Sequence, residues 1–171
     1  HRIAHYLDWN RDKRHFILLA GMHNRSRETQ LFIQRLDGDG EASTSQVPLF
    51  GLSDPPQLDE LADGRIAVTY RVQDPDINDG RYTAFVQILD GTTLQPMGEP
   101  IEAFINLSRS SITKAVVALD DGGFIVFGSV FDASFSSTRI LQRYDSDGNR
   151  AGAELELEFE DINEVVNLGG G

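Results

Sequence analysis

The sequence contains no cysteine, only one tryptophan and two methionines, and no long apolar run. The lack of cysteine excludes disulfide bonds, thiol catalysis and cysteine-ligated metal sites. No stretch approaches the roughly 20 apolar residues that a membrane-spanning helix needs, so we expect no membrane insertion. With 171 residues and a hydrophobic content of 40%, the chain is nevertheless long and apolar enough to bury the core of one domain.

Positive charge is also scarce, because 15 lysines and arginines stand against 27 aspartates and glutamates, for a net charge of −12. An acidic surface repels phosphate groups, so we do not expect a nucleic-acid-binding protein. It attracts cations, of which calcium is the simplest candidate, although a net charge also serves solubility. The sequence begins with His1 and shows no signal peptide, so we expect a processed chain or part of a longer one.

One seven-residue segment recurs three times, with its glutamine at positions 34, 87 and 142, which are 53 and then 55 residues apart. A period of this size is typical of stacked units, none of which buries its apolar face alone. The copies are Leu31-Phe32-Ile33-Gln34-Arg35-Leu36-Asp37, Ala84-Phe85-Val86-Gln87-Ile88-Leu89-Asp90 and Arg139-Ile140-Leu141-Gln142-Arg143-Tyr144-Asp145.

Each repeat carries four short apolar runs. The first ends in a leucine, and the second has no polar alternation, which predicts a strand covered on both faces. The third is the glutamine segment, whose period-two alternation places the glutamine on the more apolar face of a strand. The runs are, repeat by repeat, Ile3–Leu7, Phe16–Ala20, 31–37 and Gln46–Phe50; Gln57–Leu61, Ile66–Tyr70, 84–90 and Pro100–Phe104; Ala115–Leu119, Phe124–Gly128, 139–145 and Ala153–Phe159.

Turns rich in aspartate and glycine separate the runs, as tight hairpins require, with a longer polar turn over Asp8–Arg14 in the first repeat. Four antiparallel strands in each repeat predict an all-β, propeller-like array of blades rather than a two-sheet sandwich. We expect one domain over 1–171, with blades at about 1–52, 53–108 and 109–160 and the first strand of a fourth at about 161–171. Since closed propellers have at least about four blades, we expect an open or incomplete ring and a fragment of a longer chain.

The third repeat shows a leucine, an acidic-glycine turn and an aromatic-valine strand over 117–126, then Gln-Arg-aromatic-Asp and an Asp-Gly-Asn turn over 139–149. This pattern resembles the propeller-like repeats of very large secreted bacterial proteins, including calcium-binding repeats-in-toxin exoproteins and adhesins. The second repeat departs from it at Ile88, and the first lacks the acidic-glycine turn. The resemblance implies an extracellular or cell-surface protein with a binding, adhesive, spacer or scaffold role, and it supplies no catalytic motif.

The loop 74–80 carries alternating oxygen side chains, which suit a hard cation such as calcium. Its candidate ligands are Asp74, Asp76, Asn78 and Asp79. The loop departs from an EF-hand because Asp79 stands where glycine belongs, and a solvated acidic connector is the alternative. Two further aspartate-rich strings, over 37–40 and 145–149, lie between strands, which predicts hairpin turns there.

The recurring glutamines Gln34, Gln87 and Gln142 are expected to hydrogen-bond the backbone of a neighbouring strand, because buried polar groups need partners. A local basic patch, His23, Arg25 and Arg27, lies on the connector equivalent to loop 74–80, so the two loops are candidates for a ligand rim at one end of the array. A facing pair of His5 and His15 across the first hairpin would supply two metal ligands, but no third ligand stands at a suitable spacing, so we expect surface or hairpin positions for these histidines instead.

Three functions compete. The first is a non-catalytic binding or scaffold module, with a protein or glycan ligand. The second is a subunit or fragment that completes a larger propeller by docking against blades of the same or a neighbouring chain. The third is a carbohydrate-active enzyme, which needs two positioned carboxylates; Asp59 and Glu60 are available, but no pair stands out. We expect no catalysis, and calcium is the one cofactor considered.

Overall fold

The computed structural model describes residues 4–10, 15–23, 29–37, 39, 41–43, 47–49, 52–73, 81–105, 110–134 and 136–158. All regular elements in these ranges are strands, and no helix that could cross a membrane occurs in them. The strands are β1 (Ala4–Asn10), β2 (His15–His23), β3 (Thr29–Leu36), β4 (Val47–Leu49), β5 (Leu52–Glu60), β6 (Ile66–Gln73), β7 (Tyr82–Leu89), β8 (Ile101–Glu102), β9 (Ser110–Ala118), β10 (Phe124–Phe131), β11 (Ser137–Tyr144) and β12 (Leu155–Leu157).

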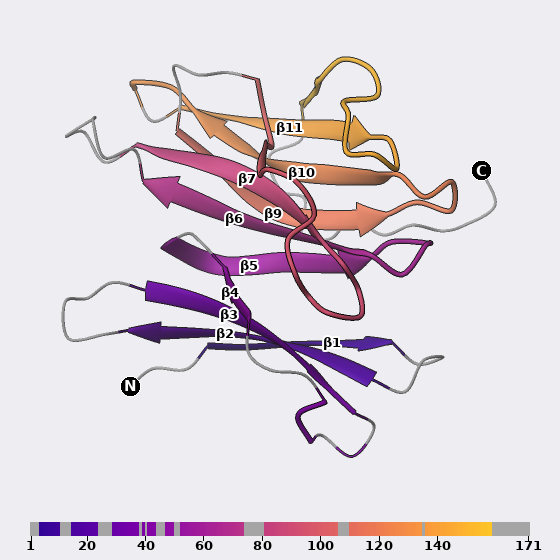
Figure 1. Cartoon of the computed structure of the whole chain (residues 1–171). Coiled ribbons are helices and arrows are strands. Elements are labelled where there is room, and N and C mark those ends of the chain that lie inside the picture. Colours follow the sequence, from indigo (N-terminus) through magenta and orange to yellow (C-terminus); the bar gives the residue numbers. More distant parts are fainter. Residues whose placement is uncertain are drawn as a thin grey trace.

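The strands form three separate antiparallel sheets, each of four strands that are neighbours in the chain. The first sheet is β1-β2-β3-β4, the second is β5-β6-β7-β8 and the third is β9-β10-β11-β12. Figure 1 shows them layered in chain order, from indigo through magenta to orange and yellow. The prediction of an all-β fold with four antiparallel strands in each repeat is therefore confirmed.

The three sheets share one register, so the sequence repeat is also a structural repeat. In each sheet the glutamine of the third strand lies opposite an apolar residue of the second strand; the pairs are Leu18 with Gln34, Val68 with Gln87, and Val126 with Gln142. The short fourth strand begins at the same place in each sheet; the pairs are Ile33 with Val47, Val86 with Ile101, and Leu141 with Leu155. Residues at equal register are called counterparts below.

The first strand of the first repeat differs from the prediction. β1 continues through Asp8 to Asn10, where a polar turn was expected, because antiparallel pairing with β2 uses backbone groups and tolerates polar side chains. The register pairs Leu7 with Leu18 as it pairs Leu58 with Val68, so Leu7 is the counterpart of Leu58. The expected equivalence of the leucines that end the first runs was therefore wrong for the first repeat.

The second sheet is packed on both faces. One face, with Ile66, Val68 and Leu89, packs against Ile33 and Val47 of the first sheet. The other face packs small residues of the second sheet against aromatic rings of the third; this core includes Ala67, Ala84, Val86, Ala103, Phe124 and Tyr144. All residues from Ile66 to Tyr70 are buried, which confirms that this unbroken apolar run is a strand covered on both sides.

Candidate functional site

The sheets have two chemically different ends. At one end lie the described hairpin turns that follow first and third strands, for example the β5–β6 and β11–β12 turns; we call it the aspartate-turn end. At the other end the second strands end and the third strands begin, for example β6 and β7 or β10 and β11; we call it the connector end. In Figure 1 these strand ends lie together at the left.

Aspartates at the aspartate-turn end bind their own backbone. Oδ1 of Asp145 accepts hydrogen bonds from the N–H groups of Asp147 at 2.9 Å and Asn149 at 2.8 Å. Oδ1 of Asp37 likewise accepts from Asp39 and Glu41. The backbone bond from Asn149 lowers the pKa of Asp145, because it stabilises the carboxylate. The two aspartate strings are therefore turn-forming segments, as predicted.

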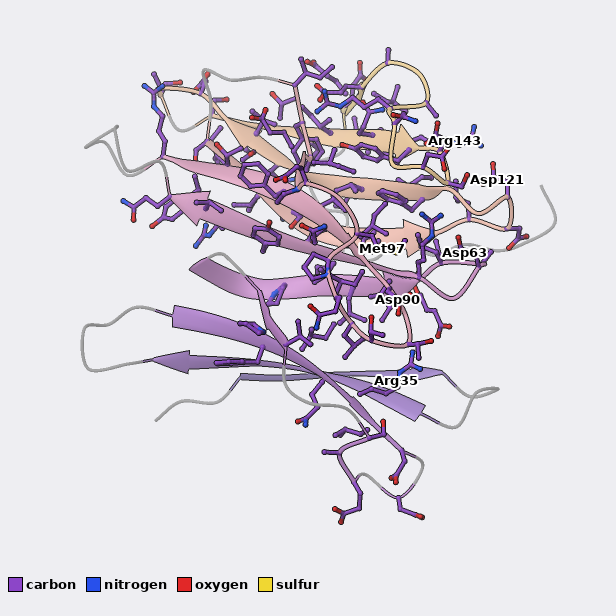
Figure 2. All side chains as sticks on the ribbon, in the orientation of Figure 1. Arg35, Asp63, Asp90, Met97, Asp121 and Arg143 are labelled. Atoms are coloured by element: carbon purple, nitrogen blue, oxygen red, sulfur yellow. The ribbon has the colours of Figure 1, made fainter. Side chains whose placement is uncertain are left out.

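Arginines neutralise further carboxylates at this end. Arg65 Nε lies 2.6 Å from Asp63 Oδ2, and the same guanidinium donates to the backbone carbonyl of Ser146 in the third sheet. Arg143 pairs with Asp121 in the same way. Figure 2 shows Asp63, Asp121 and Arg143 along one edge of the stack. Within the described part of the chain, no three histidine or acidic side chains form a group that could hold a metal ion.

The predicted calcium loop lies outside the described residues. Asp74, Asp76, Asn78 and Asp79 occupy 74–80, between β6 and β7, so calcium binding there stays a prediction.

Of the three residues predicted to form a basic rim, only His23 lies within the described residues. His23 ends β2 and pairs with Thr29, whereas Arg25 and Arg27 lie outside the described residues. Gln73 at the end of β6 pairs with Tyr82 in the equivalent manner. The strand ends that lead into the two predicted loops thus have equivalent places in adjacent sheets.

The connector end holds two arginine contacts that sequence reasoning missed. The guanidinium of Arg71 lies 4.3 Å from the ring centre of Tyr82, a cation–π geometry. Arg139 Nη1 donates to Ser129 Oγ at 2.5 Å, and these two residues face each other across β10 and β11. Arg71 and Ser129 are counterparts, so an alignment of the second strands would have shown that the two arginine contacts lie at the same register position. Guanidinium groups here suit carboxylate or sugar hydroxyl recognition.

The glutamines brace the backbone. Gln87 Nε2 donates to the carbonyls of Ile88 at 3.1 Å and Gly98 at 3.2 Å. Gln142 Nε2 donates to the carbonyls of Arg143 and Gly152, at 2.7 Å and 3.3 Å. Both glycines have positive φ, 77° and 97°, and precede the fourth strand. The side chains are 5% and 0% exposed, so each glutamine ties the third strand to the segment before the fourth.

The histidine pair that the sequence left open as an alternative does not form. His5 lies opposite Ala20 and His15 opposite Asn10, five positions apart along β1 and β2. At roughly 3.3 Å per residue, this separation is too large for two ligands of one metal ion. β1 runs further than the sequence indicated, which moves the hairpin away from His5.

Asp59 is a carboxylate with an altered environment. Burial raises its pKa, while hydrogen bonds from the backbone N–H groups of Ala118 and Glu60 oppose the rise. The bond from Ala118, at 2.8 Å, links β5 of the second sheet to β9 of the third. A raised pKa is also a feature of catalytic acids, but here Oδ2 joins the two sheets and Oδ1 accepts from Glu60 in the same strand.

No protein-family model matches the sequence, and no curated protein matches it.

Proposed function

We propose that the three sheets are blades of a propeller-like array. The observation that carries this proposal is the shared register of three meander sheets packed face to face in chain order. The first strands support it further, since β5 contacts both β1 and β9, as innermost strands of adjacent blades would. A sandwich has no need of three equivalent sheets at equal spacing.

The function proposed for this array is a non-catalytic binding or scaffold module of a secreted or cell-surface bacterial protein, including an adhesive role. The resemblance of the third repeat to repeats of large bacterial exoproteins supports the location. The connector end supports the binding role, because Arg71, Tyr82 and Arg139 lie there with the strand ends that lead to Arg25 and Arg27. The aspartate-turn end suits a ligand less, since Asp37 and Asp145 bind their own backbone and Asp63 and Asp121 pair with arginines.

A glycan array containing neutral and carboxylated sugars tests the binding role. We expect binding of carboxylated glycans that the double variant Arg25→Ala/Arg27→Ala loses, while the control Arg65→Ala at the opposite end keeps it. The same chain is assayed against a panel of chromogenic glycosides, with no turnover expected. Turnover would replace the binding module with an enzyme, and the absence of any glycan binding would remove the glycan ligand.

Calcium binding at 74–80 is tested by isothermal titration calorimetry. For an extracellular module we expect a dissociation constant on the order of 10⁻⁴ to 10⁻³ M. Asp76→Asn with Asp79→Asn should abolish the heat, whereas Asp37→Asn with Asp145→Asn should not, since those carboxylates serve turns. No heat with the unaltered chain would rule out the site.

A second candidate function is that of a subunit which completes a larger assembly. One observation favours it: apolar counterparts that are buried in the second sheet are partly exposed at the two ends of the stack. Leu89 is fully buried, whereas its counterpart Leu36 is only half-buried.

A further inference from the structure

The third sheet has an outer face built like an interface. In the second sheet Val86, Ile88 and Ile101 pack toward the third sheet, and the ends of Ile88 and Ile101 reach Gly148 in its last turn. Their counterparts in the third sheet are Leu141, Arg143 and Leu155, which by strand alternation point away from the second sheet.

This outer face is open in its outer strands. Leu155 is 55% exposed and Arg143 is exposed, whereas Phe127 on β10 is buried. Among the described residues, no sheet lies against Leu155. Since the counterpart of Leu155 in the second sheet packs against the third sheet, this face of the third sheet is a candidate for packing against a further sheet.

The first sheet has the complementary outer face. In the second sheet Phe85 and Leu89 pack toward the first sheet. Their counterparts Phe32 and Leu36 alternate with the core residue Ile33, so they point away from the second sheet, and both are only partly buried. The two outer faces are therefore complementary. The outer face of the third sheet corresponds to the face that the second sheet turns toward the third. The outer face of the first sheet corresponds to the face that the second sheet turns toward the first.

The positions of charged residues support the same pairing of the two outer faces. Hydrogen bonds from Thr93 lower the pKa of Asp90, which begins the β7–β8 turn of the second sheet, and the guanidinium of Arg35 in the first sheet adds a smaller contribution in the same direction. Figure 2 shows Arg35 and Asp90 on the same edge of neighbouring sheets. Arg143 is the counterpart of Arg35, and Asp37 is the counterpart of Asp90. The outer faces thus carry opposite charges at the positions equivalent to Arg35 and Asp90, and Arg143 also pairs with Asp121 of its own sheet.

We propose that a second copy of this chain docks head-to-tail, with the outer face of the third sheet against the outer face of the partner's first sheet. This rests on the propeller-like array proposed above. Arg143 faces Asp37 of the second copy, and Leu155 packs beside its Phe32 and Leu36. When both contacts form between the same two chains, a ring of six sheets results, within the four to eight blades typical of propellers.

Analytical ultracentrifugation over a wide concentration range tests the proposal. We expect a dimer whose dissociation constant rises at least about tenfold in Arg143→Asp and in Asp37→Arg, because each places like charges across both contacts. Leu155→Lys should weaken the dimer as well. Glu99→Arg, an exposed charge reversal in the segment before β8, is the control and should leave association unchanged.

Mixing the two charge variants gives the sharper result. Each variant alone carries a repulsive pair at both contacts. In a mixed dimer, one contact joins the two substituted side chains, whose charges are exchanged but still opposite, and the other contact joins the unaltered Arg143 and Asp37. We therefore expect association to return when Arg143→Asp and Asp37→Arg chains are combined. A misfolded variant could not be rescued in this way, so the mixture separates lost docking from lost structure.

A chain that stays monomeric at all concentrations overturns the proposal. So does a dimer that neither charge variant nor Leu155→Lys affects, or one that the mixture does not restore. These outcomes leave the binding module standing, because glycan binding by a monomer is measured separately. Loss of glycan binding with an intact, charge-dependent dimer would instead remove the binding role and keep the docking.

Discussion

The second sheet and the two end sheets are built from the same repeat, yet their counterparts differ in burial. Gln87 and Leu89 are buried, whereas Gln34 and Leu36 in the first sheet are only partly covered. Val86 is fully buried, and its counterpart Leu141 in the third sheet is partly exposed. A repeat sequence therefore specifies which face each side chain occupies, but the neighbouring sheet decides how much that side chain contributes to stability.

The polar contacts between the second and third sheets add to the comparison. Tyr144 Oη donates to the carbonyl of Ala103 at 2.8 Å, and Ser111 Oγ accepts the N–H of Ala84 at 2.8 Å. The serine satisfies a buried β7 amide beyond the end of the short β8. Such contacts make this interface specific in register, because a shift of one residue would leave buried groups without partners.

The largest expected effect comes from truncating a leucine in the middle sheet. Leu89→Ala should lower the free energy of unfolding by about 2 to 5 kcal/mol, since it leaves a cavity between two sheets. Leu36→Ala, its counterpart on the outer face, should cost about 1 to 2 kcal/mol because less surface is buried there. Urea denaturation at low protein concentration measures both, and equal losses would contradict the difference between the sheets.

A smaller effect is expected at Gly91, which follows Asp90 in the β7–β8 turn. A Cβ atom there would lie 1.6 Å from the carbonyl oxygen of Gly64, so the two turns would have to separate. Gly91→Ala should cost about 1 to 3 kcal/mol through overpacking. Its counterpart in the third sheet is Ser146, so Ser146→Ala is the control and should change stability little. Thermal denaturation of the two variants compares them directly.

Replacing the bracing glutamine is expected to cost more stability in the second sheet than in the first. Gln87→Leu leaves the carbonyl of Gly98 without its side-chain donor and should cost about 1 to 3 kcal/mol. Gln34→Leu should cost less, because Gln34 is only partly buried and water can replace the amide. An unchanged melting temperature of Gln87→Leu would show that the brace does not contribute to stability.

The smallest effects concern pH, where Asp59 and Asp145 should act in opposite directions. Burial raises the pKa of Asp59, so the folded protein holds that proton more tightly, and its contribution to stability increases as pH falls toward 4. Backbone hydrogen bonds lower the pKa of Asp145, so its contribution is present above pH 4 and is lost as pH falls below it.

Asp59→Asn and Asp145→Asn test these signs against the unaltered chain. On acidification the stability difference between the unaltered chain and Asp59→Asn should move in favour of the unaltered chain. For Asp145→Asn the difference should shrink. Guanidinium unfolding at several pH values measures both, and slopes of the same sign would contradict the assignment.

Much of the fold could be predicted because hairpin turns and strand alternation are local properties. The unbroken run 66–70 indicated a doubly covered strand, and the aspartate strings indicated turns, as the structure shows. The extent of β1 could not be predicted, since polar residues join a strand whenever a partner strand offers its backbone. For the same reason the sequence could not exclude a facing pair of His5 and His15, which the register rules out.

The candidate sites were less accessible from the sequence. Arg71 and Arg139 stand at unrelated places in their repeats and come to the same level only through pairing across strands. Asp59 resembled any surface carboxylate until its bond to Ala118 was seen. The bond of Asp59 joins residues 59 positions apart, and the two arginine contacts cross a hairpin, so no pattern within a single strand records them.

The sequence by itself determined the strand count, the turns and the identity of each face, because a period of about fifty residues, period-two alternation and Asp-Gly turns act within one repeat. Only the tertiary structure decided which of these equivalent faces are buried, which carboxylates join sheets, and which apolar faces remain at the ends of the stack. Burial and desolvation arise when one sheet packs on the next, and that packing is a property of the assembled layers.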